Sequence, residues 1–203
     1  LARKFIDFTS DKDRMIHAMN RTRRKQSKYG PRSATSLWAY VKRLNNNRAK
    51  KTASAIVEFA AQNSVDVIVM EHLDFKCCKK RGSKAQKLSM WNHGAIRKCV
   101  EQKAHLRGIR IATICAWKTS ALAFDGSGSV ARDDNNHALA TFTTGKQYNC
   151  DLSASYNIGA RYFIRELLKS LSATEKSRVK AKVPDVGRRT SCTLSTLRTL
   201  VKE

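Results

Sequence analysis

The sequence predicts an α/β protein in which a mixed sheet is flanked by helices. Two short runs of apolar and β-branched residues, 65–70 and 109–114, have the composition of strands, and the helical pattern of 89–107 lies between them. A strand, a helix and a second strand at this spacing form a crossover unit, which favours parallel pairing in an α/β layer. Apolar residues at intervals of three and four over 35–60 add a long amphipathic helix.

The first part of the chain is predicted to be a short strand followed by two basic helices. Residues 5–8 have the composition of a strand, and a long helical stretch follows them. It is broken at Gly30-Pro31, a pair typical of a turn. The helical pattern resumes at Thr35. Residues 1–60 are therefore expected to form an N-terminal strand and a basic helical region.

Residues 61–172 are predicted to form the α/β core. The apolar run 65–70 is continuous rather than alternating, so both faces of this strand are expected to be covered. A basic loop, 75–87, separates the strand from the next helix. That helix is expected to end at Gly108, because glycine suits the position just after a helix C-terminus.

A hairpin insertion is predicted at about 118–147, followed by a helix from Asp151 to Ser172. Residues 125–128 (DGSG) have the composition of a turn, and 139–142 that of a short strand. Residues 173–203 form a basic C-terminal tail. Its last part is expected to be a helix with leucines at every third position, Leu194, Leu197 and Leu200.

The net charge indicates the class of partner. The chain has 40 Lys and Arg against 16 Asp and Glu, which gives +24 over 203 residues and an isoelectric point near 10.3. A field of this sign attracts polyanions, so nucleic acid is the expected partner. Charge alone does not distinguish an enzyme from a basic scaffold that binds RNA without specificity.

The cations concentrate in the basic helical region, where residues 21–57 contain no acid. Such cations can contact phosphates and release counterions, which makes affinity depend on salt. The alternative is a solvated face without a ligand. The residues predicted to bind nucleic acid are Arg21, Arg23, Arg24, Lys42, Arg43, Arg48, Lys50 and Lys51.

No membrane partner and no disulfide framework are expected. No apolar run approaches the roughly 18 residues that a membrane-spanning helix requires, and the N-terminus lacks the pattern of a signal peptide. The six cysteines lack the paired spacing of a zinc site, which favours reduced thiols. They are Cys77, Cys78, Cys99, Cys115, Cys150 and Cys192.

Two acidic residues are the candidate metal ligands. Glu71 stands at the C-terminal tip of the predicted strand, and Asp151 opens a helix of small residues. Mg²⁺ and Mn²⁺ prefer carboxylate oxygens, and a two-metal nuclease needs two or three acids converging at one cleft. We therefore predict that Glu71 and Asp151 lie close enough to share bound metal. A plain surface acid at Glu71 and a helix N-cap at Asp151 are the alternatives.

The pattern around these acids resembles a known family. Residues 151–158 (DLSASYNI), the strand end EHLD at 71–74 and the pair Thr119-Ser120 resemble the RuvC-like nuclease domain of transposon-encoded TnpB proteins and their relatives, the type V CRISPR effectors. The resemblance spans about residues 35–168 and implies an RNase-H-like (RuvC-like) fold. It also implies cleavage of DNA guided by RNA, in a prokaryotic cytoplasm. Glu71 and Asp151 take the places of two of three metal-ligating acids, and Asn157 that of a trailing Asn.

The chain departs from that family in two respects. The family's first acid follows a Gly-Ile-Asp type strand well upstream of the basic helices. The sole local candidate here, Asp7, lies closer to Glu71 than that pattern requires and lacks the Gly that usually follows. The resemblance therefore implies that this polypeptide alone lacks a metal ligand and is inactive, as part of a longer gene product. The family's zinc ribbon with two Cys-x-x-Cys pairs has no counterpart, so no zinc is expected and a compact hairpin replaces it.

Two other functional classes stay open. One is a non-catalytic nucleic-acid-binding protein, either a decayed transposon relic or an effector that binds without cutting. The other is a DDE-type transposase or resolvase, which shares the architecture and the acids. It would add a helix-turn-helix module, and the sequence shows no persuasive pattern for one.

Overall fold

The computed structural model describes residues 2–73, 90–188 and 190–202. The basic loop predicted at 75–87, with the adjacent Cys77 and Cys78, lies outside the described residues. In the described part the protein is a helix-rich mixed α/β chain with two small sheets. Its four described cysteines are free thiols.

The chain divides into two compact units, which are described one at a time. The first contains the described residues of 1–68 and 76–111, and the second those of 69–75 and 112–203. The domain boundaries predicted at about residues 60 and 172 stay predictions.

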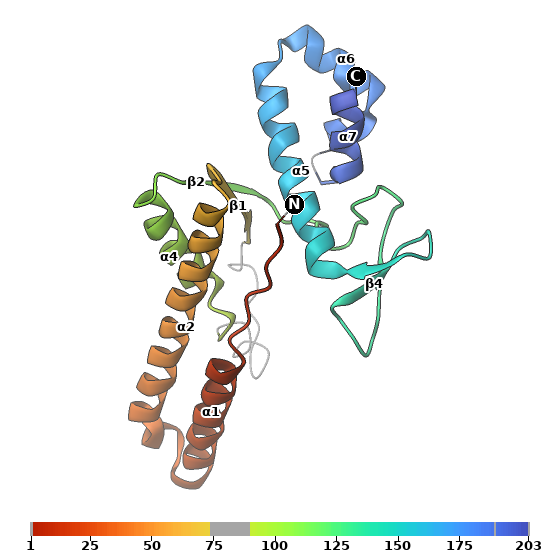
Figure 1. The fold of residues 1–203 in the computed structure, drawn as a ribbon. Coiled ribbons are helices and arrows are strands. Elements are labelled where there is room, and N and C mark those ends of the chain that lie inside the picture. Colours follow the sequence, from red (N-terminus) through yellow and green to blue (C-terminus); the bar gives the residue numbers. More distant parts are fainter. Residues whose placement is uncertain (1, 74–89, 189, 203) are drawn as a thin grey trace. The chain divides into compact units, whose positions relative to one another are not determined.

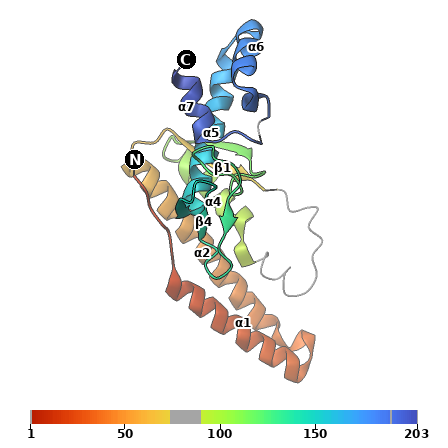
Figure 2. The ribbon, with the colours of Figure 1, turned by 90° about the vertical axis from the view of Figure 1, so that its right-hand side faces the viewer.

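The first unit is built on a helical hairpin. Helices α1 (Thr9–Tyr29) and α2 (Thr35–Gln62) lie side by side in both views of the ribbon (Figures 1 and 2) and are joined by the short 3₁₀ helix η1 (Pro31–Ala34). Gly30 turns the chain with a φ of 86°, in the left-handed region that favours glycine. Both predicted helices and the turn between them are confirmed.

The strand predicted at residues 5–8 is wrong. Residues 2–8 have no regular secondary structure. A strand needs a neighbour for its hydrogen bonds, and the described sheets pair β1 with β2 and β3 with β4 and β5, which leaves no partner for this segment. Composition alone does not reveal whether a partner exists.

Helix α2 forms the centre of the first unit. Its buried residues follow one stripe at intervals of three and four: Val41, Asn45, Ala49, Ala53, Val57 and Ala60. The alanines let neighbouring helices approach, and α2 packs against both α1 and α4 (His93–His105). The sequence predicted most of this face but not the buried Asn45, whose carbonyl accepts a hydrogen bond from Asn92 Nδ2 at 3.3 Å.

Strands β1 (Val67–His72) and β2 (Arg110–Cys115) pair in a two-stranded sheet, with α4 between them in the chain. Both strands were predicted to within about two residues. Full cover on both faces was not confirmed, because β1 is half-buried along most of its length. The chain leaves α4 through Gly108, whose φ of 69° fits the role predicted for this glycine.

The second unit contains a three-stranded antiparallel sheet. Its strands are β3 (Ala131–Arg132), β4 (Leu139–Thr141) and β5 (Gln147–Asn149). The turn at 125–128 forms as predicted, with φ of 83° at Gly126. The sheet packs around a cluster of aromatic side chains centred on Phe124.

Helices complete the second unit. They are α5 (Cys150–Ser170), α6 (Ala173–Lys182), the 3₁₀ helix η2 (Pro184–Gly187) and α7 (Leu194–Lys202). The sequence predicted α5 and α7 but missed α6, although Ser172 and Glu175 form a capping box at its start. None of the helices in the described ranges is both long and apolar enough to cross a membrane.

Candidate metal site and basic surface

Helix α5 begins with an N-cap that does not use the side chain of Asp151. The side-chain oxygen of Asn149 accepts hydrogen bonds from the N–H groups of Asp151 and Leu152, both at 3.0 Å. The N-cap alternative for Asp151 is therefore wrong, because Asn149 holds that position. Asp151 is exposed in the first turn, where the helix dipole favours a negative charge.

Glu71 is a positioned carboxylate at the end of β1. It is half-buried, and the hydroxyl of Thr119 donates to its Oε1 at 2.5 Å. Thr119 is itself buried, so this contact fixes the rotamer of the glutamate. Within the described ranges, no hydrogen-bond donor contacts the other carboxylate oxygen of Glu71.

Asn157 connects Thr119 to α5. Its side chain is fully buried, and Nδ2 donates to the carbonyls of Thr119 at 3.0 Å and Leu122 at 2.9 Å. Its Oδ1 accepts from the N–H of Leu194 at 3.2 Å. Because all of these groups are engaged, Asn157 positions chain segments rather than binding metal. Asp151 stands six residues earlier, about 9 Å along the helix axis and about a third of a turn away.

Arg161 is the residue of this region that sequence reasoning missed. Its side chain is 6% exposed, and its guanidinium donates four hydrogen bonds to backbone carbonyls. The acceptors are Cys192 (3.1 Å), Cys115 (3.1 Å), Trp117 (2.7 Å) and Thr190 (2.6 Å). Burial lowers the pKa of Arg161, while the negative charge of Glu71 opposes that shift. The available signal was an arginine four residues after Asn157, on the same helix face.

The carboxylates of Glu71 and Asp151 are the type of ligand that a hard divalent cation prefers. Glu71 and Asp151 both belong to the second unit and offer the oxygen donors that Mg²⁺ and Mn²⁺ prefer. Among residues 2–73, 90–188 and 190–202, no three His, Cys, Asp or Glu side chains gather closely enough to hold a metal ion. Asp7, the local substitute for a third acid, lies exposed in the first unit and accepts from the Thr9 hydroxyl at 2.8 Å. A shared metal site stays a prediction.

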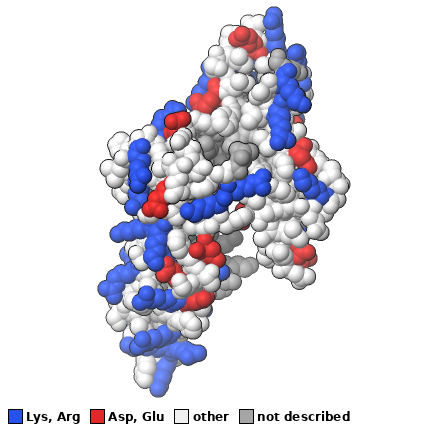
Figure 3. Space-filling view, in the orientation of Figure 1, with Lys and Arg blue, Asp and Glu red and all other residues white. Residues whose placement is uncertain are grey.

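The cations predicted to bind nucleic acid lie on the hairpin of α1 and α2. All are exposed except Arg48, which is half-buried. Figure 3 shows Lys and Arg side chains gathered over these two helices. Lys51 is partly neutralised, since its Nζ lies 2.6 Å from Asp11 Oδ2. Contact of these residues with nucleic acid stays a prediction.

One comparison establishes the fold. The chain is similar to a solved structure of Cas12f1 in a complex with sgRNA and target DNA, with a TM-score of 0.56 and 18% sequence identity. It shares that fold. The match covers 78% of this chain and 44% of that chain, so this chain spans less than half of the length of its structural neighbour. No protein-family model and no curated protein matches the sequence.

The comparison therefore confirms the predicted resemblance for the fold alone, which is a mixed α/β, Cas12f1-like fold. Within this fold, Thr119 and Asn157 link the end of β1 to α5, the two elements that carry the candidate acids. The RNase-H-like arrangement and the assignment to TnpB proteins belong to the proposal below.

Proposed function

We propose that this chain forms the RuvC-like nuclease part of an RNA-guided DNA endonuclease of the TnpB kind, with an RNase-H-like core. The observation that carries the proposal is the linkage from Glu71 through Thr119 to Asn157 of α5, the helix that opens with Asp151. The similar Cas12f1 structure holds sgRNA and target DNA, which supports the same kinds of partner for this chain.

In this proposal the side chains of the second unit prepare two carboxylates. Thr119 holds one oxygen of Glu71 and leaves the other free, and Asn149 caps α5 so that Asp151 need not do so. Bound Mg²⁺ or Mn²⁺ supplies an activated water and neutralises charge on the scissile phosphodiester. Glu71 and Asp151 would hold it. The cations of α1 and α2 would bind the phosphate backbone of the nucleic acid.

The test is plasmid cleavage by the full gene product, purified with its bound RNA, in Mg²⁺. Replacing Glu71→Gln or Asp151→Asn should lower the cleavage rate by at least about a hundredfold, because each removes a charged ligand while keeping its size. Nucleic-acid affinity should stay within about twofold, since neither acid is a phosphate-binding group.

Two exposed acids serve as matched controls. Glu58→Gln on α2 and Asp134→Asn before β4 remove the same groups from positions without an ion pair in the described part of the chain. Both should cut like the unchanged protein. Full cleavage by either Glu71→Gln or Asp151→Asn rules out the proposed site.

A non-catalytic nucleic-acid-binding protein is the second candidate. The observation that favours it is that no group of three metal-ligating side chains occurs among the described residues. Under this function the unchanged protein binds nucleic acid with strong salt dependence but does not cut in Mg²⁺ or Mn²⁺. The cleavage assay therefore separates the two candidates.

A further inference from the structure

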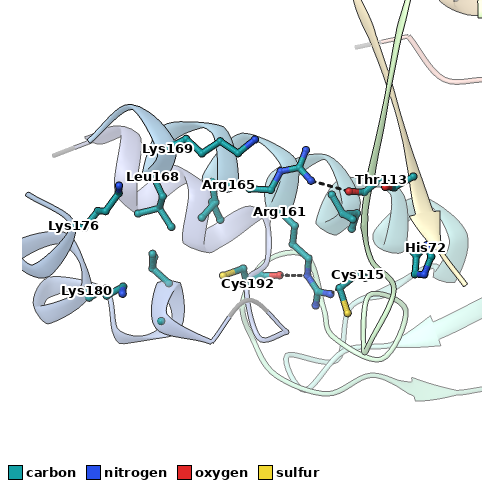
Figure 4. A pocket seen from close by; sticks show the side chains of 14 residues that line it. His72, Thr113, Cys115, Arg161, Arg165, Leu168, Lys169, Lys176, Lys180 and Cys192 are labelled. Atoms are coloured by element: carbon teal, nitrogen blue, oxygen red, sulfur yellow. Dashed lines mark hydrogen bonds between the residues drawn. The ribbon is translucent and has the colours of Figure 1, made fainter. Parts of the chain in front are cut away.

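A pocket of about 770 Å³ lies within the second unit, and its described lining does not include Thr119, the residue that donates to Glu71. Strand β2, helices α5 and α6 and the 3₁₀ helix η2 supply its walls (Figure 4). Its apolar lining comes from Ile114, Ile164, Leu168 and Val186. Successive strand residues face opposite sides, so His72 lines this pocket while the adjacent Glu71 contacts Thr119.

The charged residues that line the pocket are all basic. Arg161 and Arg165 are already engaged with backbone carbonyls, and Arg165 and Lys169 share the carboxylate of Glu166. Lys176 and Lys180 differ, because no carboxylate within the described ranges pairs with either of them. Figure 4 shows both side chains projecting from α6 toward the pocket.

The spacing of these lysines favours an anionic ligand. Lys176 and Lys180 are four residues apart, so their ammonium groups occupy one face of α6 and repel each other. A bound anion relieves that repulsion and gains charge-assisted hydrogen bonds. The aliphatic lining beside them favours a ligand that joins the anion to an apolar surface, such as the face of a nucleobase. The pocket volume lies in the range of small-molecule sites.

We propose that this pocket binds a nucleotide, with its base against Ile164, Leu168 and Val186 and its phosphate at Lys176 and Lys180. The nucleotide is either free or a unit of a single strand. This site is independent of the metal site in the proposed function, so binding here does not require cleavage.

The test is calorimetric titration of the full chain with adenosine 5′-monophosphate at an ionic strength of about 0.15 M. We expect one binding site, with adenosine and inorganic phosphate each binding at least about tenfold more weakly, because each provides half of the contacts. Replacing Lys176→Gln or Lys180→Gln should weaken binding about fivefold or more. The matched control is Arg178→Gln, which removes one charge from the same helix outside the pocket lining and should change affinity less than twofold.

A second variant tests the apolar part without changing charge. Gly187 lines the pocket, and a Cβ built on it meets no atom within 4 Å, so Gly187→Phe attaches a ring to the pocket lining through a Cβ that clashes with nothing. It should abolish nucleotide binding and leave the melting temperature unchanged. The proposal is overturned if inorganic phosphate binds as well as the nucleotide, if Arg178→Gln loses as much affinity as Lys176→Gln, or if Gly187→Phe binds normally.

Competition identifies the source of the nucleotide. If a 5′-phosphorylated single-stranded tetranucleotide displaces the monophosphate, the pocket accepts a unit of a strand, and if it does not, the pocket accepts free nucleotide. Asp151→Asn should bind the monophosphate normally, because Asp151 is not among the residues that line the pocket. Loss of DNA cleavage and loss of nucleotide binding in the pocket are thus measured in separate experiments.

Discussion

Single buried polar residues organise the candidate site. Asn157 and Arg161 are four residues apart on α5, and their side chains hold the carbonyls of segments that are remote in sequence. A buried arginine without a contacting carboxylate is costly unless its donors are satisfied. Here four carbonyls accept hydrogen bonds from its guanidinium. Loss of the Arg161 side chain would therefore leave a cavity and carbonyls without a donor.

Replacing Arg161→Ala should lower the free energy of unfolding by about 3 kcal/mol or more, because several buried carbonyls lose their donor. Arg161→Lys keeps the charge but offers fewer donors in a different geometry, so about 1–2 kcal/mol should be lost. Urea denaturation followed by circular dichroism measures both losses. Arg178→Lys on exposed α6 is the control and should change little. An Arg161→Ala variant as stable as the control contradicts this role.

The same residues show what sequence reasoning can reach at this scale. Glu71 stands out because it lies at the end of a strand, and Asp151 because it lies in the first turn of a helix. Both positions can be recognised from local sequence patterns. Arg161 does not, because an arginine in a helical stripe is usually a solvated surface residue. Its burial depends on the carbonyls of Cys115 and Cys192, which come from segments that local patterns do not bring together.

Among the elements, the insertion after β2 is held together by aromatic packing. Phe124 lies 5.6 Å from Phe142, 5.0 Å from Tyr148 and 5.2 Å from Tyr156, measured between ring centroids. Lys146 Nζ lies 4.9 Å from the centroid of the Phe124 ring. Such contacts bury large rings at favourable geometry, so aromatic packing stabilises the three-stranded sheet. In zinc-ribbon folds, a bound zinc ion stabilises the hairpins instead.

Replacing Phe124→Ala should therefore cost about 3–5 kcal/mol of folding free energy, measured by denaturation. Phe163→Ala on α5 is the control, because Phe163 is 59% exposed and its loss should cost well under half as much. A zinc chelator should leave the melting temperature of the unchanged protein where it is. A drop of several degrees on chelation contradicts the expectation that no zinc is bound.

Most elements were predictable because each carries a local pattern. The periodicity of α2, the leucines of α7 and the glycine turn at 125–128 specify structure within a few residues. The strand predicted at 5–8 failed because strands depend on partners, whereas α6 was missed although Ser172 and Glu175 mark its start. The capping pattern was present, but the many basic residues of this segment led to its prediction as a tail.

For the whole molecule, the sum of the charges and their distribution lead to different predictions for nucleic-acid binding. The chain carries a net charge of +24, and its acidic and basic residues are not evenly mixed. Helices α1 and α2 present exposed cations, of which Lys51 is paired with Asp11. If nucleic acid binds at this hairpin, phosphate contacts there release counterions, and the salt dependence of affinity reports their number. If binding instead follows total charge, any exposed cation contributes equally.

Replacing Arg21, Arg23 and Arg24 together by Gln distinguishes these cases. Each lost phosphate contact should lower the slope of log affinity against log salt by about 0.9 for double-stranded DNA, so the triple variant should lose about 2.7. The control replaces Arg178, Arg188 and Arg198 by Gln, which removes the same charge from exposed positions of the second unit. Fluorescence anisotropy at several salt concentrations measures both slopes. Equal losses in the two variants mean that net charge, rather than the surface of α1 and α2, accounts for the binding.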